Sequence, residues 1–124
     1  MKPNEHSPLP WRGQGRVLIA APEKKFRVLH LDYTVEFFGA SVSSAANKLG
    51  WHHATEQKIC LSSELLPQQM ADTFIHELLH ALCWVLDIRD GVSEESLCTR
   101  LSTGMCSVQR DNPEWFDWWK GLLK

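Results

Sequence analysis

The sequence carries almost no excess of charge and no long apolar run. Its formal net charge is −2 over 124 residues, so no basic field favours a nucleic acid or an anionic membrane as a partner. No apolar run approaches the roughly 18 residues that cross a bilayer, and the first stretch, MKPNEHSPLP, lacks the apolar centre of a signal peptide. We therefore expect a cytoplasmic protein with neither a nucleic-acid nor a membrane partner.

Paired cysteines are also missing. Cys60, Cys83, Cys98 and Cys106 form no Cys-x-x-Cys pair, and zinc knuckles depend on that spacing. Without a secretory signal, a disulfide framework is less expected than four small apolar side chains buried in a reducing compartment.

The sequence does contain enough apolar material for one core. With 44% hydrophobic residues among 124, the chain matches one compact domain. Residues 1–15 hold three prolines and two glycines among polar side chains, which predicts a flexible N-terminal arm. Residues 16–124 are expected to form a single domain.

The strand and helix signals predict an α+β chain in which three helices follow the short strands. Aromatic and β-branched side chains favour strands, and apolar residues at spacings of three and four favour helices. The expected strands are Arg16–Ala21, Tyr33–Phe38 and Lys58–Ser62. The expected helices are Leu66–Asp87, a helix capped by Ser93 that runs to about Gln109, and Glu114–Leu123. We expect the aromatic side chains of the last helix to close the core, and the alternative is a surface for a partner or ligand.

The expected helix over Leu66–Asp87 contains the sequence His76-Glu77-Leu78-Leu79-His80. Residues four apart share one face of a helix, so His76 and His80 can direct two ring nitrogens at one point. Two imidazoles suit a tetrahedral Zn²⁺, and Glu77 projects about 100° round the helix, where it can hold a water without being a ligand. A chance pattern is the alternative, but two imidazoles and a carboxylate on a buried helix are costly unless a metal compensates them.

A catalytic zinc site usually needs a third protein ligand. The extended pattern with a third histidine is absent, because Cys83 and Leu86 occupy its glycine and histidine positions. Glu94 and Glu95 begin the next expected helix, which a short turn would fold back against the first. Glu94 shares a face with the apolar stripe of that helix and Glu95 is turned about 100° away, so we expect Glu94 as the third ligand and Glu95 as the alternative.

Two further features bear on a cleft beside this helix. His52 and His53 lie in a stretch expected to be a polar loop with partly exposed rings. Adjacent side chains diverge, so the two cannot easily serve one metal; the alternative is that one of them binds substrate or stabilises an oxyanion. The strand over Lys58–Ser62 could form a wall along which an extended peptide pairs at a sheet edge, and the alternative is an ordinary buried strand.

The chain resembles the small zincin-type metallopeptidases of phages and mobile elements, and more distantly the compact gluzincins that cleave repressors of mobile elements. The resemblance covers residues 30–115 and is carried by Lys58–Ser62, His76-Glu77-Leu78-Leu79-His80, Ser93-Glu94-Glu95 and Arg110-Asp111-Asn112-Pro113. It implies a small α+β fold, with a short twisted sheet packed on the active-site helix and two more helices after it. It also implies a zinc-dependent peptidase with Glu77 as general base, a glutamate ligand on the following helix and a peptide or protein substrate. The alternative is a catalytically silent phage accessory protein that keeps zinc as a structural staple and binds a host or viral protein.

Overall fold

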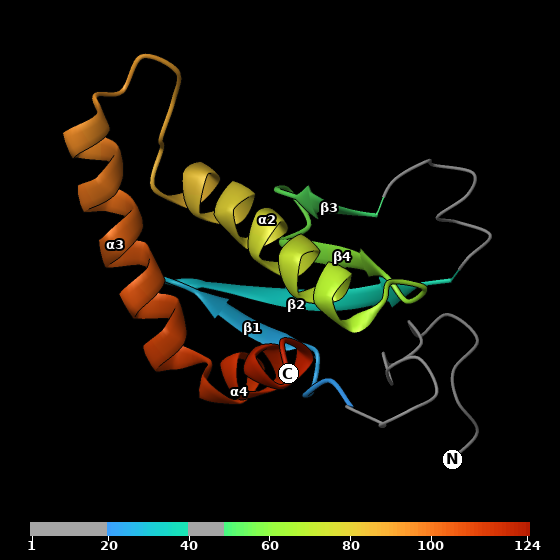
Figure 1. The fold of residues 1–124 in the computed structure, drawn as a ribbon. Coiled ribbons are helices and arrows are strands. Elements are labelled where there is room, and N and C mark those ends of the chain that lie inside the picture. The colour runs from blue at the N-terminus through green and yellow to red at the C-terminus, as the bar shows by residue number, and fades with distance from the viewer. Residues whose placement is uncertain (1–19, 40–48) are drawn as a thin grey trace.

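The computed structural model describes residues 20–39 and 49–124. Four strands form a mixed sheet, and helices pack against it (Figure 1), so the expected α+β class is confirmed. Residues 1–15, the expected arm, and residues 16–19 of the first expected strand lie outside the described part. The elements are β1 (Lys25–Val28), β2 (Leu31–Phe38), β3 (Gly50–His53), β4 (Lys58–Ser62), α2 (Pro67–Val85), α3 (Glu94–Asp111) and α4 (Pro113–Leu122).

The strand order in the sheet is β1-β2-β4-β3. β2 and β4 run parallel, with Val35 opposite Ile59, whereas β1–β2 and β3–β4 are antiparallel. β4 therefore lies inside the sheet, with a strand on each side. The expectation that Lys58–Ser62 offers a free edge to a peptide is wrong, because its main-chain groups already bond to β2 and β3.

One face of the sheet forms the core. Along β2 the side chains of Tyr33, Val35 and Phe37 are buried and alternate with more exposed neighbours, as expected for a strand covered on one face. Figure 1 shows α2 lying across the sheet and α4 beside β1. The Phe26 ring on β1 packs edge to face against the Phe74 ring on α2 and the Trp115 ring on α4, with ring centroids 5.6 and 6.0 Å apart, so both helices cover this face.

Helix α2 follows its apolar pattern closely. Pro67 occupies the first turn, where its missing N–H costs nothing, and the Gln69 side chain accepts a hydrogen bond from the Leu66 N–H at 3.1 Å. The core-facing residues Met70, Phe74, Leu78 and Leu82 are all fully buried. The helix ends at Val85, two residues earlier than expected.

The last two helices also match their sequence signals. Ser93 caps α3 by accepting a hydrogen bond from the Ser96 N–H at 3.2 Å. At the junction with α4, the Asn112 side chain accepts from the Arg27 N–H and donates to the Arg27 carbonyl, both at 2.7 Å. The aromatic residues of α4 close the core as expected: Trp115, Phe116 and Trp118 are buried.

The structure differs from the sequence expectations at the His52–His53 stretch and at the cysteines. The stretch with His52 and His53 is the strand β3 and not a loop, because its backbone pairs with β4. The expectation that all four cysteines are buried holds for Cys60 but is wrong for Cys98 and Cys106, which lie on the solvent-facing side of α3. Within residues 20–39 and 49–124, no helix has the length and apolar character needed to cross a membrane.

Candidate active site

The candidate site lies between α2 and the edge strand β3. Gly50 allows the close approach of these two elements: a Cβ at this position would come 2.8 Å from the Cys60 carbonyl oxygen and 3.0 Å from Cγ2 of Thr73. A larger residue would push β3 away from the helix. Glycine at position 50 therefore sets the width of the space between them.

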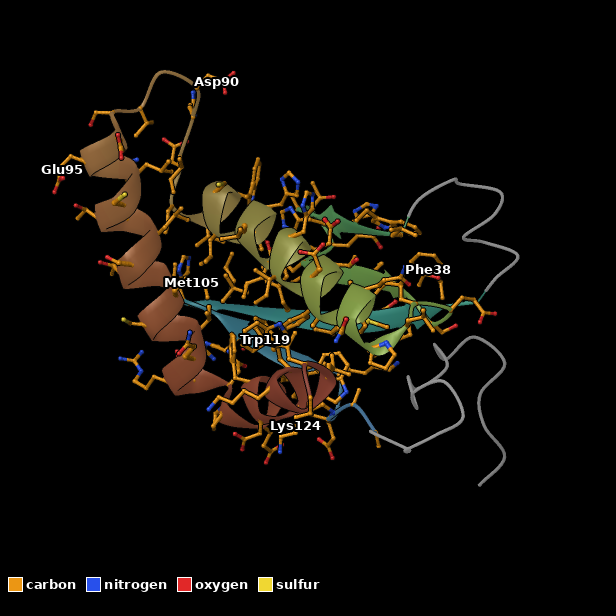
Figure 2. All side chains as sticks on the ribbon, in the orientation of Figure 1. Phe38, Asp90, Glu95, Met105, Trp119 and Lys124 are labelled. Carbon is orange, nitrogen blue, oxygen red and sulfur yellow. The ribbon has the colours of Figure 1, made fainter. Side chains whose placement is uncertain are left out.

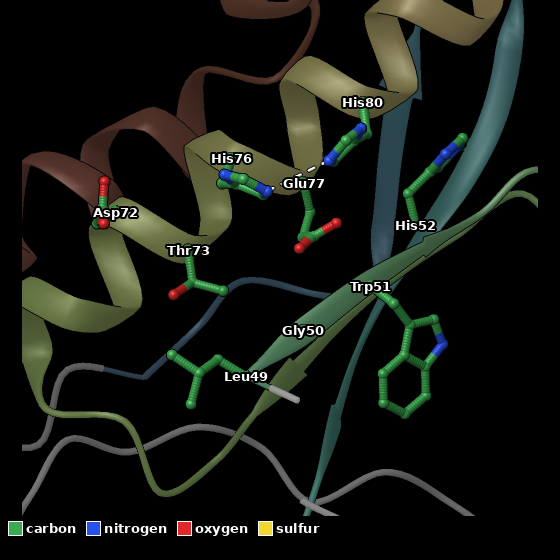
Figure 3. A pocket seen from close by; sticks show the side chains of 9 residues that line it. All are labelled: Leu49, Gly50, Trp51, His52, Asp72, Thr73, His76, Glu77 and His80. Carbon is green, nitrogen blue, oxygen red and sulfur yellow. Dashed lines mark hydrogen bonds between the residues drawn. The ribbon is translucent and has the colours of Figure 1, made fainter. Parts of the chain in front are cut away.

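That space is a cavity of about 550 Å³. Figure 3 shows that one wall is the helix and the other is the strand. The cavity is lined by Leu49, Gly50, Trp51 and His52 from the strand side and by Asp72, Thr73, His76, Glu77 and His80 from α2. The three residues of the His-Glu-x-x-His pattern that carry chemistry thus share one cleft.

The two histidines of α2 converge as their spacing predicts. Nε2 of His76 and Nε2 of His80 are 3.2 Å apart, and their ring centroids are separated by 4.9 Å. Two nitrogens that bind one tetrahedral Zn²⁺ at 2.0–2.1 Å are about 3.4 Å apart, so the observed pair fits this geometry closely. Both side chains are exposed, contrary to the expectation that they are buried on the helix.

Glu77 differs from the two histidines in its environment. Its side chain is only 6% exposed, yet it lines the cavity, and Figure 3 shows its carboxylate directed from α2 into the gap toward β3. A carboxylate held in such a shielded position has stronger interactions with nearby protons and charges than one in bulk water. It can therefore act as a base on a water that enters between His76 and His80.

His52 reaches the cleft from β3. Its Nε2 is 2.7 Å from the hydroxyl of the buried Tyr33, and the two rings are nearly parallel at an angle of 11°. Burial is the main cause that lowers the pKa of His52, and positive charge on His80 and His53 lowers it further. Burial likewise raises the pKa of the Tyr33 phenol. The pair therefore consists of a neutral imidazole and a neutral phenol.

His53 has a different surrounding from its neighbour. Its Nε2 lies 3.2 Å from Oε2 of Glu56, and both side chains are about half exposed. Adjacent residues of a strand point to opposite faces, so His53 faces away from α2 while His52 faces it. The expectation that the two histidines diverge is confirmed, and His52 is the one in the cleft.

The structure does not bring the expected third ligand to this cleft. Glu94 and Glu95 lie in the first turn of α3, where both are exposed, and the described residues lining the cavity do not include them. Figure 2 shows Glu95 at the N-terminal end of α3. Among residues 20–39 and 49–124, no three His, Cys, Asp or Glu side chains are grouped so that they could hold a metal ion.

The turn between α2 and α3 explains the position of these glutamates. Asp87 has a φ of 53° and Gly91 a φ of 85°, so the chain leaves α2 through two left-handed residues. The Arg100 guanidinium donates to the carbonyls of Leu86 and Asp87 at 3.4 and 3.2 Å. These bonds hold the start of α3 beside the end of α2, beyond the turns that carry the two histidines.

The sequence suggested only that either His52 or His53 could reach the cleft, and it did not single out Tyr33. The alternation along β2 could have placed Tyr33 on the buried face, but its pairing with His52 depends on the order of strands in the sheet. Comparison of the chain with family models, with curated proteins and with solved structures finds no match.

Proposed function

We propose that this chain is a zinc-dependent peptidase, encoded by a phage or another mobile element as its resemblance implies. The observation that carries the proposal is the convergence of His76 Nε2 and His80 Nε2, 3.2 Å apart, beside the shielded carboxylate of Glu77 in one cleft. Two imidazoles at this separation suit a zinc ion, and a nearby carboxylate supplies the base that hydrolysis of a peptide requires.

The residues present fit two of the three protein ligands of a catalytic zinc. His76 and His80 would hold the ion, and we propose Glu94 as the third ligand, with Glu95 as the alternative. Both glutamates are exposed in the first turn of α3 and lie outside the cleft. Coordination by either one would therefore require the first turn of α3 to move toward the turns of α2 that carry His76 and His80.

Zinc held at this position would lower the pKa of a bound water towards about 7 and polarise the scissile carbonyl. Glu77 takes a proton from the attacking water and delivers it to the leaving amine, which is the work of a general base followed by a general acid. The low exposure of Glu77 supports this role, because bulk water does not screen its carboxylate fully.

The edge strand β3 supports a peptide substrate in an extended conformation. The Ser62 N–H donates to the Leu49 carbonyl at 2.8 Å, and bonded pairs alternate along an antiparallel ladder. The main-chain groups of Gly50 and His52 therefore point away from β4. No described strand lies on that side, so an extended peptide can pair there beside the cavity.

The role of Glu77 is tested by the variant Glu77→Gln. Zinc content and hydrolysis of unfolded casein are measured together on the full chain, with Glu64→Gln, an exposed glutamate outside the cavity, as the matched control. Zinc should be retained and hydrolysis should fall by at least a hundredfold in Glu77→Gln only. Unchanged hydrolysis in this variant removes Glu77 as the base, and zinc binding without hydrolysis in the natural chain favours the structural-zinc alternative.

The third ligand is tested by comparing Glu94→Ala with Glu95→Ala. We expect Glu94→Ala to weaken zinc affinity by tenfold or more and Glu95→Ala to leave it unchanged, as measured by competition with a chromophoric chelator. The reverse result assigns the ligand to Glu95. Unchanged affinity in both variants excludes the first turn of α3 from the metal site.

A further inference from the structure

The Tyr33–His52 pair is a polar feature of the cleft that the proposed function leaves unused. Tyr33 is 1% exposed on the core face of β2, and its hydroxyl reaches past β4 to the ring of His52, 2.7 Å away. Figure 3 shows His52 rising from β3 next to His80. The buried phenol of Tyr33 thus fixes the position of the His52 side chain at the cleft.

The hydrogen bond determines which nitrogen of His52 carries the proton. The phenol hydrogen of a buried tyrosine needs an acceptor, and Nε2 of His52 lies within bonding distance of it. An imidazole that accepts at Nε2 carries its hydrogen on Nδ1. The Nδ1–H group is then the donor of His52 that Tyr33 leaves available, and His52 lines the cavity.

Asp72 and Trp51, two other polar side chains of the cavity, suit a developing negative charge less well. Asp72 is a carboxylate and repels it. The Trp51 ring stacks on Phe38 at 4.6 Å, on the face of the sheet opposite to His52. His52 therefore combines a fixed donor with a position in the cleft opposite the helix that carries Glu77.

We propose that His52 donates a hydrogen bond from Nδ1 to the substrate carbonyl oxygen on which negative charge develops during hydrolysis, and that Tyr33 is the positioning residue that fixes the tautomer of His52. The assignment rests on the proposed peptidase function and adds to it the group that stabilises the oxyanion. No proton is transferred by His52: the hydrogen bond strengthens as charge builds up, while Glu77 carries the proton from the water to the amine.

The first experiment measures binding of methylphosphonate, a small tetrahedral anion, to the zinc-loaded full chain by titration calorimetry. We expect His52→Ala to weaken this binding about tenfold or more, and Tyr33→Phe, which removes only the hydroxyl, to weaken it severalfold. His53→Ala is the matched control, because it alters the adjacent histidine on the other face, and its binding should equal that of the natural chain. Zinc affinity should be the same in all four proteins.

The second experiment reads the tautomer directly in the metal-free protein. Long-range ¹H–¹⁵N spectra of the natural chain should show His52 protonated on Nδ1, and Tyr33→Phe should reduce that fraction. A merely structural role of Tyr33 would leave the tautomer unchanged, which would overturn its assignment as the positioning residue.

The outcomes separate this inference from the proposed function. A natural chain that binds no zinc overturns the peptidase proposal and the role of His52 with it. Zinc binding with methylphosphonate affinity that is absent, or equal in His52→Ala and the natural chain, overturns the role of His52 alone. Lower zinc affinity in His52→Ala also overturns it, because His52 would then be a ligand of the metal.

Discussion

The Cys60 thiol lies on the interior strand β4, where it is 7% exposed. Burial is the main cause that raises its pKa from 9.0 to about 11, and the negative charge of Glu36 contributes next. Because the folded chain disfavours the thiolate, the stability that this thiol contributes is fully present below pH 9 and is lost as the pH rises through 11.

We therefore expect the natural chain to lose more stability than the variant Cys60→Ala between pH 8 and about pH 11. The difference should be about 1 to 2 kcal/mol, reduced from the full value by partial solvent screening. Urea unfolding at several pH values measures it. Cys106→Ala, which removes an exposed thiol, should follow the natural chain; equal pH dependence in all three proteins would contradict the prediction.

The crossing of α2 and α3 depends on Gly104. A Cβ at this position would lie 2.9 Å from Cδ2 of Leu82 and 3.0 Å from Cδ1 of Leu86. Leu82 belongs to the core, and Leu86 packs against it. Such separations are too short for ordinary contact, so one of the leucines or α3 itself must shift. The glycine is what allows α3 to lie close to the helix that carries the histidines.

The variant Gly104→Ala should therefore lose up to about 2 kcal/mol in free energy of unfolding, because an overpacking cost of about 1 to 3 kcal/mol exceeds the gain of up to about 1 kcal/mol from helix propensity. Gly121→Ala is the control on α4, where an added Cβ meets nothing within 4 Å, and it should be neutral or more stable by up to about 1 kcal/mol. Thermal unfolding compares the two variants. Similar changes in both would show that helix propensity, and not the contact with Leu82 and Leu86, decides the effect.

At the scale of the whole molecule, binding of the proposed zinc ion is coupled to folding of the chain. His76 and His80 converge only when α2 is formed, so zinc should bind the folded chain far more tightly than the unfolded one. A ligand at 1,000 times its dissociation constant stabilises the folded state by about 4 kcal/mol. The midpoint of thermal unfolding should then rise by roughly 10 °C or more on addition of zinc.

This increase should disappear in His80→Ala and persist in His53→Ala, whose ring lies outside the cavity. Addition of a chelator to the natural chain should return the midpoint to its metal-free value. Scanning calorimetry with and without zinc measures all of these midpoints. A midpoint that does not move in the natural chain would contradict the proposed metal site.

The sequence by itself determined the features that depend on local periodicity and local hydrogen bonds. The spacing of His76 and His80 placed both rings on one face of α2, because a helix brings residues four apart together whatever surrounds it. The cap of α3 at Ser93 is a contact between residues three apart. The buried face of β2 followed from the alternation of side chains along one strand.

Only the tertiary structure decided which segments meet. Four residues are too short for a periodic signal, so β3 became recognisable as an edge strand through its pairing with β4, and this pairing placed His52 against Tyr33. The turn after α2 left Glu94 exposed, although its helix face favoured an inward position. Such long-range arrangements depend on strand order and turn geometry, and these are set by the packing of the whole core and not by any local stretch of sequence.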